Sequence, residues 1–242
     1  MVAAALSPPP FPGPGAVSRA RRRLATVVVE GLELPGMRLA EHLVGLRVGT
    51  LVLRDDRPVS LRDAGFRSFD AGRPRAEAAA EVLSVQAEET SVVEAPAESS
   101  ICGADLHILA FRQEVPDIAL HRGFEESPAV LPVLVTPAGW RVGPLLLEDS
   151  LTCSRCVGVG RLAEHGPMGP DAAPGLQEEA AAAVAAQQVA VLIDGAAPAA
   201  VEQAGLLADA RTGGIAPVRT LPDQRCVCPG AASGSLEGSV GL

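Results

Sequence analysis

Several residue types are missing or scarce in this chain of 242 residues, and each absence excludes a kind of chemistry. The chain has no lysine, asparagine or tyrosine, and aromatic residues make up only 2% of it. Without lysine, no Schiff base can form on a side-chain amine, and positive charge for phosphate chemistry must come from arginine, protonated histidine or the amino terminus. The net charge of −9 argues against nonspecific binding to nucleic acid.

The hydrophobic content is high, but it is spread over short runs. Apolar residues make up 48% of the chain, which is enough for a sizeable core built from alanine, valine and leucine. The longest apolar stretch, residues 180–193, is interrupted by two glutamines and is too short to span a bilayer. The amino-terminal segment lacks the charged region and the apolar length of a secretory signal. We therefore expect a cytoplasmic protein with neither a membrane nor a nucleic acid as its partner.

Residues 24–56 are the stretch around which the rest of the chain is organised. The run at 25–29 is apolar and β-branched, as a buried parallel strand requires. Gly31 and Gly36 bracket a turn, and the helix predicted after it carries a broad apolar face. A second short strand at 51–53 completes a predicted strand–helix–strand unit.

This unit carries part of a nucleotide-binding pattern. Asp55 follows the second strand, and an acidic residue about 20 residues after a glycine turn is where a dinucleotide-binding fold contacts a ribose. The glycine pattern itself is damaged, because Glu33 stands where the second glycine of G-x-G-x-x-G lets the backbone approach phosphate. Two interpretations therefore stay open, a nucleotide site and a plain βαβ turn without a ligand.

Strands and helices continue to alternate after this unit. The predicted helices cover residues 74–85, 116–123 and 177–193, and Gly195 is placed to end the last of them. The predicted strands cover residues 90–94, 104–110, 129–136 and 139–147, with a hairpin formed by 204–210 and 215–221. This alternation predicts an α/β fold with a Rossmann-like, doubly wound and mostly parallel sheet.

The cysteines form two closely spaced pairs. Cys153 and Cys156 form a CxxC motif, and Cys226 and Cys228 form a CxC motif about 70 residues later, a pattern that suits one tetrahedral zinc. Four sulfur ligands leave no position open for water, so such a zinc is structural. The alternative is a redox-active or unrelated set of cysteines. Cys102 stands alone, and we expect a buried thiol there.

Two further motifs stand in order with the glycine turn, the acidic strand end and the cysteines. They are G-R-P-R-A-E-A at 72–78 and Gly-Pro-Leu at 143–145, shortly before the CxxC motif. In this order the motifs resemble those of the ThiF/MoeB family, within the ubiquitin-activating-enzyme-like superfamily, over about residues 24–228. The resemblance implies a Rossmann-like ATP-binding domain, usually dimeric, with one structural zinc. Family members adenylate the C-terminal carboxylate of a small protein or peptide, and degenerate relatives bind leader peptides or partner enzymes in peptide-modifying pathways.

The family's functional residues carry over unevenly. Asp55 matches the ribose-binding acid, and Arg67 matches an arginine that reaches the γ-phosphate. Arg75 stands where the family has a phosphate-contacting lysine, which keeps the charge but changes the geometry. Glu33 replaces a phosphate-facing glycine, and residues 110–113 lack the carboxylate that handles magnesium in the family. These departures disfavour ATP and magnesium as cofactors.

We therefore expect a degenerate family member that binds a small protein, a leader peptide or a partner enzyme, as a dimer or heteromer. The alternative is an active ATP-dependent adenylyltransferase, and an NAD-linked dehydrogenase gives no reason for four paired cysteines. The basic run at 19–23 is either a solvated charge run or a contact for an acidic partner. The expected parts are a disordered Pro/Gly/Arg-rich leader at 1–23, a ThiF-type domain at 24–149, a zinc-binding element at 150–229 and a disordered tail at 230–242.

Overall fold

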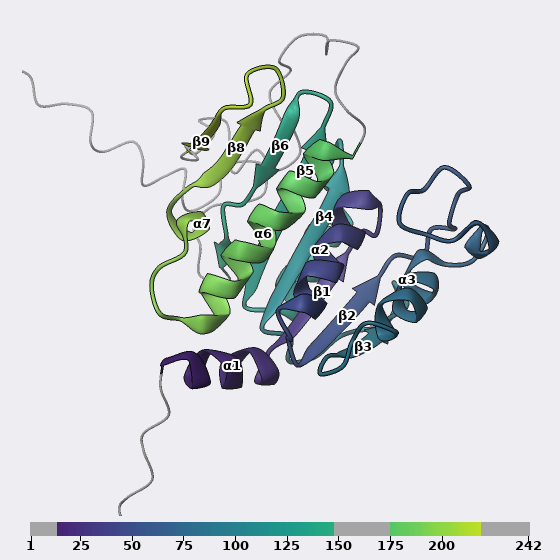
Figure 1. Cartoon of the computed structure of the whole chain (residues 1–242), viewed down its shortest axis with the longest axis horizontal. Helices are drawn as coiled ribbons and strands as arrows, with labels where there is room; N and C mark the ends of the chain where they lie inside the picture. The colour runs from purple at the N-terminus through teal and green to yellow at the C-terminus, as the bar shows by residue number, and fades with distance from the viewer. Residues whose placement is uncertain (1–13, 148–174, 219–242) are drawn as a thin grey trace, which may run out of the picture.

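The computed structural model describes residues 14–147 and 175–218, which form a single nine-stranded sheet flanked by helices (Figure 1). The strands are β1 (Thr26–Glu30), β2 (Thr50–Arg54), β3 (Ser91–Glu94), β4 (Leu106–Arg112), β5 (Ala129–Thr136), β6 (Gly139–Val142), β7 (Leu146–Leu147), β8 (Gly205–Asp209) and β9 (Ile215–Val218). The helices are α1 (Pro14–Leu24), α2 (Leu34–Gly45), α3 (Arg75–Ser84), α4 (Asp117–Glu126), α6 (Leu176–Asp194) and α7 (Ala200–Gln203), with a short 3₁₀ helix η1 (Ser68–Asp70).

The first half of the sheet is parallel. The strand order is β3-β2-β1-β4-β5-β6-β8-β9, and the pairs within β3-β2-β1-β4-β5 are all parallel. Chain order reverses at β1, which lies between β2 and β4, so β1 and β4 flank the topological switch point. A mixed α/β fold consistent with the Rossmann type is therefore confirmed in its general form.

The two faces of the sheet carry different layers. Odd-numbered residues of β1, such as Val27 and Val29, belong to the main core with α2, α3 and α6. Even-numbered residues face the other way, where Val28 packs with Val52 and where α4 covers β4 and β5. This alternation follows from the two-residue period of a strand, and it explains why the buried strands are apolar on both sides.

The second half of the sheet is antiparallel. β6 pairs with β5 and β8, and β8 pairs with β9, which confirms the predicted hairpin. The single strand expected at 139–147 is divided into β6 and β7 at Gly143, whose φ is 76°, and Pro144, which has no N–H to donate. Helix α6 ends at Gly195, as predicted, and the φ of 59° there is the left-handed conformation common at the end of a helix.

Part of the amino-terminal leader is helical rather than disordered. Residues 14–24 form helix α1, so the predicted disordered leader is wrong for this segment. The reason is a long-range anchor, because Arg22 donates to both carboxylate oxygens of Asp194 at 2.7 and 2.5 Å. Arg21 also donates to the backbone carbonyl of Asp194, and α1 packs against α6. Figure 1 shows α1 lying across one end of the sheet.

The described carboxyl-terminal residues, 175–218, belong to the same sheet and helix layer as the preceding part of the chain. α6 packs against α2 and lies over β5 and β6, while β8 and β9 extend the sheet. Cys102, which was expected to be buried, is exposed because it lies in the loop between β3 and β4 rather than in a strand. Among the described residues, no helix is long and apolar enough to cross a membrane.

Candidate functional site

The candidate site lies at the carboxyl ends of β1 and β2, where the chain turns into α2. Gly31 adopts a φ of 89°, and a side chain there would overlap the backbone carbonyl of Ala110 on β4. A side chain on Gly36 would overlap the carbonyl oxygen of Gly31. Both glycines are therefore required by the packing of α2 against the sheet, with or without a ligand. Their presence alone does not indicate a nucleotide.

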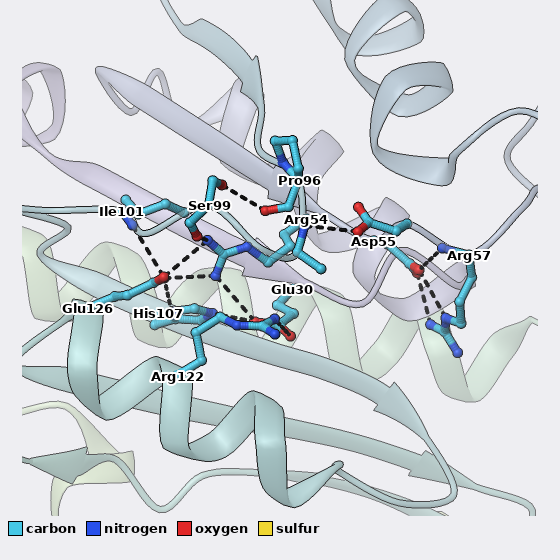
Figure 2. A network of polar contacts seen from close by, with 12 residues as sticks. Glu30, Arg54, Asp55, Arg57, Pro96, Ser99, Ile101, His107, Arg122 and Glu126 are labelled. Carbon is cyan, nitrogen blue, oxygen red and sulfur yellow. Dashed lines mark hydrogen bonds and ion pairs between the residues drawn. The ribbon is translucent and has the colours of Figure 1, made fainter.

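Asp55 is held by the protein itself. Its carboxylate accepts two hydrogen bonds from the Arg57 guanidinium at 2.9 and 2.8 Å (Figure 2). It also accepts the Leu32 N–H at 2.8 Å. Arg75 approaches the same carboxylate at 3.5 Å. Burial raises the pKa of Asp55, but the hydrogen bonds from Arg57 and Leu32 outweigh it, so its pKa lies below the ordinary value. The group expected to contact a ribose is thus already bound by arginine.

Glu33 and Arg75 complete a compact set of charges with Asp55. The Glu33 carboxylate lies 3.3 Å from the Arg57 guanidinium and 3.8 Å from that of Arg75. Arg75 is buried and donates to Asp63 at 3.1 and 2.8 Å. We call Glu33, Asp55, Arg57, Asp63 and Arg75 the carboxylate–arginine cluster. Three carboxylates against two guanidiniums give it one net negative charge, which disfavours a triphosphate.

Three residues of the turn offer no backbone donor to a phosphate. Pro35 lies in the first turn of α2 and has no N–H. The N–H of Gly31 donates to the carbonyl of Arg54 at 3.0 Å, and that of Leu32 donates to Asp55. A helix N-terminus binds anions through free N–H groups, and these three residues contribute none to such a site.

Arg67 lies outside the carboxylate–arginine cluster. It donates to Asp70 at 2.9 Å and to Glu81 at 2.9 Å, and its guanidinium stacks 4.4 Å from the centre of the Phe69 ring. Hydrogen bonds from Arg73 and Arg67 lower the pKa of Glu81 to about 2. Among the described residues, Arg67 shares no ion-pair partner with Arg75. The structure therefore brings Asp55, Glu33 and Arg75 together and leaves Arg67 on the surface of the loop before α3.

A second polar network, which was not predicted from the sequence, lies on the face of the sheet that α4 covers, opposite to α2 and α3 (Figure 2). Arg54 donates to both oxygens of Glu126 at 2.8 and 3.1 Å. His107 Nε2 lies 3.1 Å from Glu30, and Arg122 donates to Glu30 at 2.7 Å. We call these five side chains the buried ion network. Its signal in the sequence is a charged residue ending each of two apolar strands.

The buried ion network adjoins the candidate site along the chain. Glu30 and Arg54 are the last residues of β1 and β2, so each immediately precedes a site element, Gly31 and Asp55 respectively. The side chain of Arg54 is only 1% exposed and that of Glu126 is 4% exposed. Burial of this kind makes paired charges costly to separate, so the network holds both strand ends in one position.

The described residues offer no obvious magnesium or zinc ligands. No group of three or more histidine, cysteine or acidic residues among them is placed to hold a metal. Arg112 at the end of β4 pairs with Glu178 at 3.2 Å, and Gln113 follows it with a φ of 71°. The expected zinc ligands lie outside the described residues: Cys153, Cys156, Cys226 and Cys228. Among the described residues, the excess of carboxylates over guanidiniums in the carboxylate–arginine cluster disfavours a magnesium-bound triphosphate there.

No family model matches this chain, and no curated protein matches it by sequence. Solved structures match it by fold. PaaA is 16% identical with a TM-score of 0.65, over 85% of this chain and 76% of PaaA. MccB of E. coli is 16% identical with a TM-score of 0.69, over 88% of this chain and 67% of MccB. The microcin C7 biosynthetic enzyme MccB in complex with N-formylated MccA gives the same identity and TM-score, over 89% and 70%. At this identity the likeness establishes a shared fold.

Proposed function

We propose that this chain is a degenerate member of the ThiF/MoeB family that binds a peptide or a partner enzyme in a peptide-modification pathway. The shared fold with PaaA and with the microcin C7 biosynthetic enzyme MccB supports this pathway class. MccB has been solved with the MccA peptide, which supports a peptide as the partner of this chain. The order of motifs along the sequence agrees with the same family.

The observation that carries the proposal is the pair of hydrogen bonds that Arg57 donates to Asp55. A ribose hydroxyl would have to displace a two-bond guanidinium contact, which is among the stronger hydrogen-bond arrangements in proteins. Glu33 adds repulsion, because a carboxylate about 4 Å from a phosphate charge costs about 1 kcal/mol in water and about 4 kcal/mol near a protein surface. Together these features make the carboxylate–arginine cluster a poor triphosphate site.

An active adenylyltransferase is the second candidate, and one observation favours it. The Arg57 side chain is 47% exposed, so it is free to rotate towards solvent and release Asp55. In that arrangement Asp55 and Arg75 would keep the positions that the family assigns to a ribose contact and a phosphate contact. The two candidates therefore differ in one measurable property, the binding and turnover of ATP.

ATP–pyrophosphate exchange separates the two candidates. The full chain is incubated with ATP, magnesium, labelled pyrophosphate and candidate peptides that carry a free C-terminal carboxylate. We expect no exchange above a protein-free control. Exchange by the wild-type protein that is abolished in Asp55→Ala would establish the adenylyltransferase and refute the degenerate assignment.

A further inference from the structure

A cationic groove lies at the end of the sheet opposite to the carboxylate–arginine cluster. Helix α1 forms one wall of the groove and the end of α2 forms the other, around a volume of about 550 Å³. Arg19, Arg22 and Arg23 come from α1, Arg47 follows α2, and Glu89 is the acidic residue of the lining. The basic run singled out in the sequence is therefore part of a defined surface. We call it the arginine groove.

The ion pairs of the groove leave positive charge in excess. Arg22 is paired with Asp194, which anchors α1 to α6. Arg23 and Arg47 share a single carboxylate, Glu89, at 3.3 and 2.9 Å. Among the described residues, no carboxylate pairs with Arg19. Four guanidiniums against two carboxylates leave a net charge of +2 at this surface.

This surface is available to a ligand. The Arg23 and Arg47 side chains are 63% and 60% exposed, so both guanidiniums reach solvent while still sharing Glu89. The protein as a whole carries a net charge of −9, so a local excess of positive charge stands against the general field. An anionic ligand is steered to such a surface and repelled from most of the remainder.

The chemistry of the lining favours an acidic peptide over a nucleic acid. Proteins that bind single-stranded nucleic acid stack bases on aromatic side chains, and the described residues that line the arginine groove include no aromatic residue. Guanidiniums bind carboxylates through paired N–H donors, and the groove volume lies within the range of about 300–1,000 Å³ that holds small ligands. A few acidic residues of an extended peptide match this size and charge.

We propose that the arginine groove docks an acidic segment of the peptide that this protein recognises. The proposal rests on the proposed function only for the identity of the ligand as a peptide. The arginine groove and the carboxylate–arginine cluster lie at opposite ends of β1. The acidic segment is therefore held away from the turn after β1, as a recognition segment remote from the modified end would be.

Fluorescence anisotropy of a labelled hexaglutamate peptide tests the docking directly. The full chain at low salt should bind hexaglutamate but not hexaglutamine, and hexaglutamate binding should weaken as added salt screens the charges. The double variant Arg19→Gln/Arg23→Gln should raise Kd by about fivefold, since each exposed ion pair contributes a modest amount. Glu89→Gln removes the competing carboxylate and should lower Kd. Arg22 is left unchanged because it anchors α1.

Arg211→Gln is the control for net charge. It removes one positive charge, as Arg19→Gln does, but it lies in the turn between β8 and β9, at the other end of the sheet from α1 (Figure 1). It should leave Kd unchanged, and circular dichroism melting should show that all variants fold like the wild type. The single variant Arg19→Gln is measured beside it, and a shift in Kd from Arg211→Gln equal to that from Arg19→Gln would overturn the proposal, because the binding would then follow overall charge alone.

Two further outcomes also overturn the docking proposal. One is the absence of hexaglutamate binding at low salt by the folded wild-type protein. The other is tighter binding of a labelled oligothymidylate of equal charge that responds to the same variants, which would assign the groove to nucleic acid. Pyrophosphate exchange plays no part in this test. Exchange together with groove-dependent hexaglutamate binding would refute only the degenerate assignment and leave the docking proposal standing.

Discussion

The substitution Arg57→Ala tests whether Asp55 is held by the protein in place of a ligand. The Arg57 guanidinium makes two hydrogen bonds with Asp55 at 2.9 and 2.8 Å and lies 3.3 Å from Glu33. Charge-assisted hydrogen bonds contribute about 1.5–3 kcal/mol, and the half-exposed position of Arg57 reduces this through solvent screening. Asp55 keeps Arg75 and the Leu32 N–H. We therefore expect a loss of about 1–2 kcal/mol in the free energy of unfolding at neutral pH.

The pH dependence of this loss identifies its origin. The pKa of Asp55 is lowered in the folded protein, so its contribution to stability is present above its unfolded pKa of about 4 and is lost as pH falls through the folded pKa. Removing Arg57 raises the folded pKa of Asp55 towards its ordinary value. The difference in stability between wild type and Arg57→Ala should therefore shrink as the solution is acidified below about pH 4.

Urea unfolding at several pH values measures this difference, with Arg62→Ala as the matched control. Arg62 is an exposed arginine of the same loop, and its replacement should change stability little at any pH. The reasoning is refuted if Arg57→Ala is as stable as wild type at neutral pH. It is also refuted if the difference in the free energy of unfolding stays constant as the pH is lowered below about 4.

Three more predictions concern the turn, the buried ion network and the cysteines. Glu33→Gly should tighten ATP binding about tenfold or more in calorimetry, by removing a like charge near the phosphate position, and unchanged low-micromolar binding would contradict this. Glu126→Ala should cost about 3 kcal/mol in urea unfolding because buried Arg54 loses its hydrogen-bonded carboxylate and keeps only Glu30, 3.7 Å away, whereas Glu125→Ala, an exposed neighbour, should cost little. Elemental analysis should find about one zinc per chain, held by the CxxC and CxC motifs, and a metal-free folded protein would end that idea.

Part of the candidate site could be predicted from local sequence. Asp55, Glu33 and Arg75 stand at fixed offsets from a strand, a glycine turn and a helix start, and the structure brings these three together. Their roles towards a nucleotide stay predictions. Arg67 shows the limit of this approach, because its direction depends on Asp70 and Glu81 rather than on its distance from Asp55 along the chain.

The sequence by itself determined the strand–helix–strand unit and the late hairpin. Apolar periodicity and glycine positions act over a few residues, so they report local structure that tertiary contacts then keep. Gly195 illustrates this, because a left-handed residue at a helix end is required by the backbone alone.

Only the tertiary structure decided the contacts between distant parts of the chain. Helix α1 is ordered by Asp194, whose contact with Arg22 spans 172 positions of sequence. The buried ion network joins two strand ends, β4 and α4, and only the strand order brings Glu30 close to His107 and Arg54 close to Glu126. Charge pairing depends on distance in space, whereas composition and periodicity carry no information on which distant residues meet.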